Sequence, residues 1–197
     1  MERTICKTLA QLTSADVVRV TSAGQAFKLD LSQVDEKRRE LIAGYIARLV
    51  YHVPRWVRSL RIVSRPTEGD GKYADVGYDL RYGYATINLY ANFFESEYDE
   101  RAETILHELA HLTLAPMISM SDRLAEQLEK NGQRGEAFFL RDQIERVEEA
   151  IVSDIAHVSL IELSLRGQVT TPTVEFIETL PLEPTGKDYA SASEAAT

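Results

Sequence analysis

The sequence has little cysteine, little basic charge and no long apolar run. Its single cysteine, Cys6, excludes both an intramolecular disulfide and a cysteine-rich zinc site. No run approaches the roughly 20 apolar residues that span a bilayer. The opening residues also lack the charged and apolar regions of a signal peptide. These absences predict a reduced, cytoplasmic protein without a membrane partner.

The shortage of basic residues also bears on the partner. The chain has 22 Lys and Arg against 31 Asp and Glu, a formal net charge of -9. Because proteins that bind phosphate backbones need an excess of Lys and Arg on one face, nucleic acid is not expected as a partner. The composition predicts neither an oligomeric state nor a substrate.

Length and composition fit one globular domain. With 197 residues, 44% of them hydrophobic, the chain can bury a sizeable core. We expect a single domain over residues 1–183. The small polar residues of 184–197 predict a disordered tail.

Periodicity predicts strands in the first half of the chain and helices around them. Apolar residues recur at helical spacing over about 33–52, and Pro54 bars continuation. Residues 59–65 form one expected strand. Alternating runs at 73–82 and 84–90 predict two more, joined as an antiparallel pair.

The second half of the chain is predicted to be helical. A helix should begin near Ser96 and end near Ala115, because Pro116 follows. A second helix is expected over about 122–130, a turn at "NGQRG", and a long third helix over about 136–165. Strands followed by helices predict an α+β fold.

The stretch "TILHELAHLTLAP", residues 104–116, carries the strongest chemical signal. On a helix His107 and His111 lie one turn apart, about 5–6 Å between Cβ atoms, so both rings can bind one ion. Zinc binds such nitrogens at about 2.0–2.1 Å. Glu108 can then take a proton from a metal-bound water, which is the chemistry of H-E-x-x-H. The alternative is a helix with two solvated histidines and a surface glutamate.

A catalytic zinc needs a third protein ligand. Position 117 is Met, so the longer metzincin pattern with a third histidine is absent. A carboxylate on the last helix is expected instead. Its inward stripe is predicted to be Leu140, Ile144, Val147, Ile151, Ile155 and Val158.

Helix phase ranks the candidates for that third ligand. Glu148 flanks the apolar stripe and is the preferred ligand, because a buried carboxylate needs a partner. Glu149 falls on the side expected to face water, and the choice between the two stays open. Asp154 could orient a ligand histidine or lie on the surface, and His157 is expected on the surface.

With these residues the sequence resembles the zincin metallopeptidases of the gluzincin type, and also the small SprT-like or phage-encoded metallopeptidases. The resemblance covers about residues 57–165, and only HELAH is specific. It implies a small antiparallel or mixed sheet packed on helices, with the HExxH helix and a later long helix forming the metal site. It assigns His107 and His111 as zinc ligands, Glu108 as general base and Glu148 as third ligand. The sequence departs from the glutamate motif of larger gluzincins and lacks the zinc ribbon of many SprT-like proteases.

The function that the resemblance implies is that of a zinc metalloendopeptidase. Zinc is the expected cofactor, and a peptide or protein is the expected substrate. An edge strand such as "YATINLY" could pair with an extended substrate. The rival readings are a catalytically silent zinc-binding module and a protein-interaction module that uses the helix 136–165 as a docking face.

Overall fold

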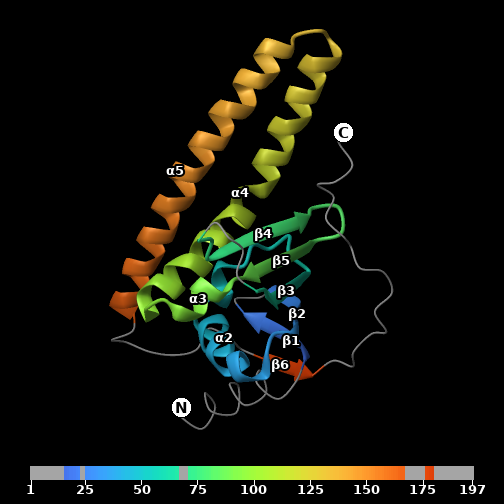
Figure 1. Cartoon of the computed structure of the whole chain (residues 1–197). Coiled ribbons are helices and arrows are strands. Elements are labelled where there is room, and N and C mark those ends of the chain that lie inside the picture. Colours follow the sequence, from blue (N-terminus) through green and yellow to red (C-terminus); the bar gives the residue numbers. More distant parts are fainter. Residues whose placement is uncertain (1–15, 23–24, 67–70, 167–175, 180–197) are drawn as a thin grey trace.

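The structure, a computed structural model, describes residues 16–22, 25–66, 71–166 and 176–179 (Figure 1). In chain order these residues form β1 (Val17–Ser22), β2 (Gln25–Gln33), α2 (Glu36–Leu49), the 3₁₀ helix η1 (Val50–His52), β3 (Ser59–Ser64), β4 (Ala74–Asp79), β5 (Tyr84–Leu89), α3 (Ala91–Glu95), α4 (Tyr98–Lys130), α5 (Arg134–Arg166) and β6 (Phe176–Thr179). The predicted α+β class is confirmed. The expected tail over 184–197 lies outside the described residues.

The strands form one mixed, six-stranded sheet in the order β4-β5-β3-β2-β1-β6. β2, β3 and β5 are parallel, and the remaining pairs are antiparallel. The predicted antiparallel pair of β4 and β5 is confirmed. β5 was expected as an edge strand, and this was wrong: β5 lies between β4 and β3, and β4 is the edge strand beside it among the described residues.

The core lies where the sheet meets the helices. Along β5 the alternate residues Ala85, Ile87 and Leu89 are buried, while the residues between them are more exposed. The same core contains apolar residues of α2 and of the first half of α4. The apolar side of the first half of α4 therefore packs against the core. Its polar side faces away from that core.

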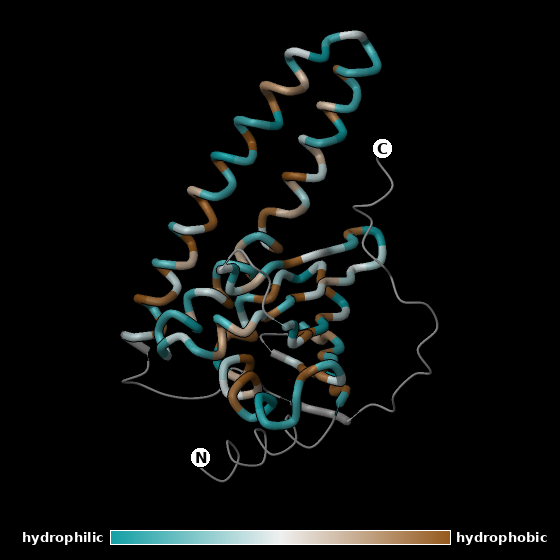
Figure 2. The backbone as a smooth tube through the Cα atoms, viewed as in Figure 1, coloured by the Kyte–Doolittle hydropathy of each residue, from teal (hydrophilic) through white to brown (hydrophobic). Residues whose placement is uncertain are grey.

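α4 and α5 form an antiparallel hairpin that projects beyond the sheet (Figure 1). Each has 33 residues and is about 50 Å long. Figure 2 shows brown, apolar positions continuing into the projecting part. Several large apolar side chains there are exposed: Met120, Leu124, Phe138 and Phe139.

No helix in the described ranges is both long enough and apolar enough to cross a membrane.

The prediction that Pro116 ends a helix was wrong. α4 runs through Pro116, so the two helices expected over 96–115 and 122–130 are one. A proline has no N–H, which leaves the carbonyl four residues earlier without its usual donor. That carbonyl belongs to Leu112, and it accepts a hydrogen bond from Nε1 of Trp56 at 3.0 Å. The indole thus replaces the missing donor, and Pro116 itself is exposed.

We expect Trp56→Phe to lower the free energy of unfolding by about 1–3 kcal/mol, because the Leu112 carbonyl then loses its donor. In a Pro116→Ala background the new N–H at position 116 can serve that carbonyl. The same Trp56→Phe change should then cost about 1 kcal/mol less. Denaturant titration followed by circular dichroism measures all four proteins. Equal costs in the two backgrounds would show that the indole does not substitute for the proline's missing donor.

Candidate metal centre

The HELAH residues lie on the part of α4 that is anchored to the sheet. Ile105, Leu109 and Leu112 are fully buried, as their helical spacing predicts. The side chains of His107 and His111 are 29% and 16% exposed, so both are partly accessible. They are neither core residues nor fully solvated ones.

The two histidine rings point their Nε2 atoms at the same place. Those atoms are 3.2 Å apart, and the rings meet edge to face. Two nitrogens bound tetrahedrally to one zinc at about 2.0–2.1 Å are separated by about 3.3 Å. The separation in the structure is therefore close to the one that a shared ion requires.

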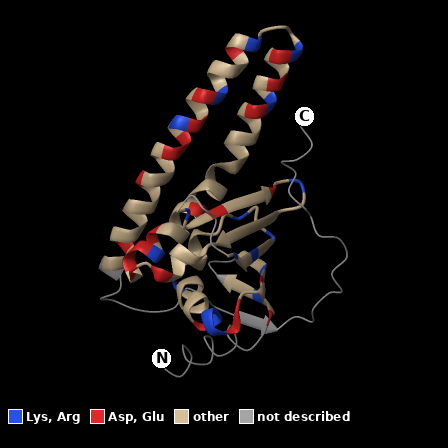
Figure 3. Ribbon diagram, viewed as in Figure 1, with Lys and Arg blue, Asp and Glu red and all other residues tan. Residues whose placement is uncertain are grey.

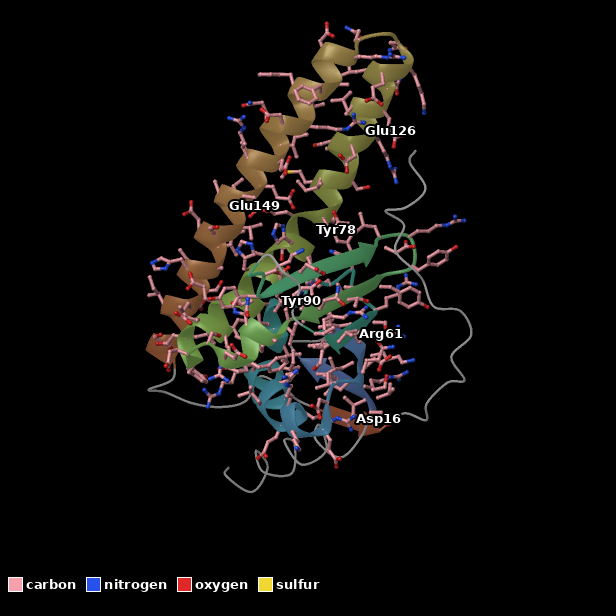
Figure 4. All side chains as sticks on the ribbon, in the orientation of Figure 1. Asp16, Arg61, Tyr78, Tyr90, Glu126 and Glu149 are labelled. Carbon is pink, nitrogen blue, oxygen red and sulfur yellow. The ribbon has the colours of Figure 1, made fainter. Side chains whose placement is uncertain are left out.

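A carboxylate of α5 completes this group, and it is Glu149. Its two oxygens lie 3.7 Å from Nε2 of His107 and 3.6 Å from Nε2 of His111. His107, His111 and Glu149 could together hold a metal ion. Glu149 lies on α5, whereas both histidines lie on α4, so the group joins the two helices (Figure 4).

Glu148, the ligand preferred from helix phase, lies elsewhere. Its side chain is 18% exposed against 59% for Glu149, as the phase predicted. However, its Oε1 lies 2.9 Å from Nδ1 of His111, on the far side of the ring from Nε2. With the proton on Nδ1, that nitrogen donates to Glu148 and Nε2 keeps its lone pair. Glu148 therefore lies beside Nδ1 of His111, whereas Glu149 lies beside the Nε2 atoms of both histidines.

The apolar stripe predicted for α5 was partly wrong, and this explains why Glu149 rather than Glu148 lies beside the two Nε2 atoms. Val147 and Val158 were expected inside but are 51% and 63% exposed. The buried positions of α5 are Ala137, Val152, Ala156 and Ser159. Because this face is turned from the predicted one, Glu148 and Glu149 both lie toward α4. His157 is exposed, as expected, and so is Asp154.

Glu108 is buried, which disagrees with the alternative of a surface glutamate. Only 6% of it is exposed, and no hydrogen bond joins its carboxyl to another described side chain. Burial raises the pKa of Glu108 from 4.5 to about 7, while His111 acts in the opposite direction. A carboxyl group with a pKa near 7 can both accept and return a proton at neutral pH.

Burial also acts on the first histidine. It lowers the pKa of His107, and the neighbouring His111 lowers it further. A neutral imidazole has the free lone pair that a metal requires. At neutral pH His107 is therefore ready to act as a ligand.

A cavity of about 410 Å³ opens beside these residues. Glu108 and His107 line it from α4, Ala74 lines it from the edge strand β4, and Ser153 and Ala156 line it from α5. The buried carboxyl and the first histidine thus face a space that can admit a molecule.

A polar network centred on Asp75, which sequence reasoning missed, adjoins Ala74, a residue that lines this cavity. Asp75 accepts hydrogen bonds of 2.6 Å from the hydroxyl of Tyr90 and from Nδ2 of Asn88. It also forms an ion pair with Lys72, with 3.1 Å between the two charged groups. Burial alone would raise the pKa of Asp75, but these bonds outweigh it and lower that pKa. Figure 4 labels Tyr90 near the start of α3. The position of Asp75 in a strand indicates that it is half-buried, but its hydrogen-bond partners Asn88 and Tyr90 come from elsewhere in the chain.

The chain matches no protein-family model, no curated protein and no solved structure. What these side chains can do therefore follows from their own geometry and chemistry.

Proposed function

We propose that the protein is a zinc-dependent metallopeptidase. One observation carries this proposal: two imidazole nitrogens 3.2 Å apart, with the carboxylate of Glu149 beside them. Two histidines and a glutamate form a known catalytic zinc set, which leaves a fourth position open. Soft sulfur ligands are absent from this group, and the imidazole and carboxylate donors suit zinc.

Bound zinc would lower the pKa of a water molecule toward 7 and polarise the carbonyl of a peptide bond. The protein's own residues have separate tasks. Glu108, buried at the cavity wall, accepts the proton of the attacking water and returns it to the leaving amine. Glu148 holds the ring of His111 in the tautomer that presents Nε2. These tasks explain why a metal group and a buried carboxyl occur together.

The edge strand β4 fits a role in substrate binding. It borders the cavity through Ala74. Among the described strands it pairs only with β5, so its other edge has no neighbouring strand. An extended peptide could add to its other side through backbone hydrogen bonds. This replaces β5 in the role that the sequence suggested.

The test is hydrolysis of an unstructured protein, such as casein, by the zinc-loaded chain. The Glu108→Gln variant is the comparison, because it changes only the proposed base. Turnover that needs zinc and Glu108 supports the proposal. A zinc-loaded chain that cleaves no peptide would leave a silent zinc-binding module.

A second candidate function is docking to another protein through the projecting hairpin. The observation behind it is the group of exposed apolar side chains on that hairpin, among them Phe138 at 73% and Phe139 at 64% exposure. Exposed apolar groups of this size favour an interaction surface. Zinc content separates the two candidates, because docking through the hairpin has no use for a metal.

A further inference from the structure

The cavity continues from the metal centre along the first turns of α4. Glu100, Glu103, Thr104 and His107 line it, at the spacing of one helix face. Glu100 lies about 10 Å from His107 along the axis. A second hollow of about 260 Å³ adjoins it and shares Tyr73 and Glu100 with it. We call the two hollows together the acidic groove.

The charge of the acidic groove has one sign. Glu95, Glu100, Glu103 and Glu108 line it, and no Lys or Arg among the described residues does. Figure 3 shows acidic residues gathered at the beginning of α4. Low-dielectric walls concentrate such a field and raise the local concentration of cations.

Some of this charge has a structural role, and some has none. Glu100 caps α4, since its Oε2 accepts the N–H of Glu97 at 3.2 Å. Glu103 is exposed in the second turn and has no ion pair with any described residue. Lys72, whose charge acts on Glu108, is paired with Asp75. Glu103 therefore offers a carboxylate that the fold itself does not use.

Two further observations indicate that the acidic groove receives a ligand. Only 6% of Glu108 is exposed, and it makes no hydrogen bond to a described side chain. It lines the same space. Tyr73 is 46% exposed at the junction of the two hollows and offers an aromatic ring. Carboxylates with an aromatic ring are the groups that bind ammonium and guanidinium ions.

We propose that the acidic groove binds a positively charged group of the substrate, so that the protein selects peptides with a cationic group beside the scissile bond. This inference rests on the proposed hydrolysis and names its substrate class. The cation is either a Lys or Arg side chain or the N-terminal ammonium of a short peptide. Glu103 is the specificity-determining residue, and Glu100 and Tyr73 complete the groove.

The test measures binding first, so that it does not depend on turnover. Fluorescently labelled peptides are titrated with the zinc-loaded Glu108→Gln protein, and anisotropy gives Kd. The peptides are an arginine peptide, its citrulline counterpart, which has the same shape without the charge, and N-acetylated forms of both. We expect the arginine peptide to bind about tenfold more tightly than the citrulline peptide at low salt, with a smaller difference at high salt.

Matched variants separate the effect of the acidic groove on peptide binding from the effect of the chain's overall negative charge. Adding Glu103→Gln should reduce the arginine preference to about twofold or less. Glu126→Gln makes the same change far along α4, where Glu126 lies near the end of the hairpin (Figure 4), and should leave the preference intact. An unchanged preference in the Glu103 variant, or equal loss in both variants, overturns the proposal.

The remaining outcomes identify the source of the cation and keep the two proposals apart. A preference that acetylation removes and citrulline does not assigns the groove to the N-terminal ammonium. Equal binding and equal cleavage of all four peptides overturn the groove while hydrolysis stands. Charge-selective binding without cleavage of any peptide by the wild-type protein overturns hydrolysis while the groove stands.

Discussion

Glu108→Gln is expected to lower the rate of peptide hydrolysis by about 10²–10⁴-fold, the usual contribution of a positioned general base. The amide has the shape of the carboxyl but cannot accept the water's proton. Because Glu108 is no ligand in the geometry, zinc content should stay the same. Initial rates on a quenched peptide, with zinc measured on the same samples, give the result.

The matched control for this variant is Glu126→Gln, on the same helix and outside the cavity. It should keep full activity. A Glu108→Gln protein that turns over at the wild-type rate would mean that another group accepts the proton. A variant that loses both zinc and activity would instead assign Glu108 to the metal.

The same variant also has an expected effect on the stability of the metal-free protein. The pKa of Glu108 is about 7 in the folded protein, above its ordinary 4.5, because burial disfavours the ionised form. An acid whose folded pKa is raised makes the protein less stable as pH rises from 4.5 through 7, by at most about 3 kcal/mol. Metal-free Glu108→Gln should therefore be at least as stable as the wild type at pH 8.

Glu149→Gln is expected to weaken zinc binding by more than the roughly 10–100-fold that losing a supporting residue costs. Its oxygens lie beside both Nε2 atoms, and an amide is a poor ligand for zinc. Glu148→Gln should weaken binding much less, because its amide oxygen still accepts the hydrogen bond from Nδ1 of His111. Competition with a chromophoric chelator at fixed pH and salt measures both affinities.

The pair of variants also tests the alternative assignment. If Glu148→Gln causes the larger loss, Glu148 is the ligand, as helix phase first suggested, and Glu149 is a surface residue. Alanine at each position adds a control: Glu148→Ala removes the acceptor and should cost more than Glu148→Gln. Equal affinities for Glu148→Ala and Glu148→Gln would contradict the orienting role.

The sequence predicted β3, β4, β5 and the helical second half of the chain, where local patterns decide the structure, but it did not predict β1, β2 or β6. The alternation of β5 was recognisable because strand period is local, whereas burial along β4 does not alternate. The start of α4 was expected at Ser96, and the residue that caps it is Glu97. The course of α4 through Pro116 was not, because it depends on Trp56, which lies distant in the chain. Local rules for proline hold only where no distant donor serves the freed carbonyl.

The candidate site shows the same division. The motif set the spacing of His107 and His111, so the convergence of their rings could be predicted. The third residue depended on how α5 is rotated against α4. A small rotation exchanges the positions of neighbouring residues, and exposed Val147 and Val158 show that apolar periodicity did not determine it. Asp75 and its partners were missed because they meet only when β4, β5 and the residues after them assemble.

The most direct test of the metal centre is the zinc content of the purified protein. After metal-replete purification and dialysis, we expect elemental analysis to find about one zinc per chain. The His107→Ala, His111→Ala double variant should hold none while its circular dichroism spectrum stays helical. A wild-type protein without zinc, or a double variant that keeps it, would contradict the assignment of these two histidines.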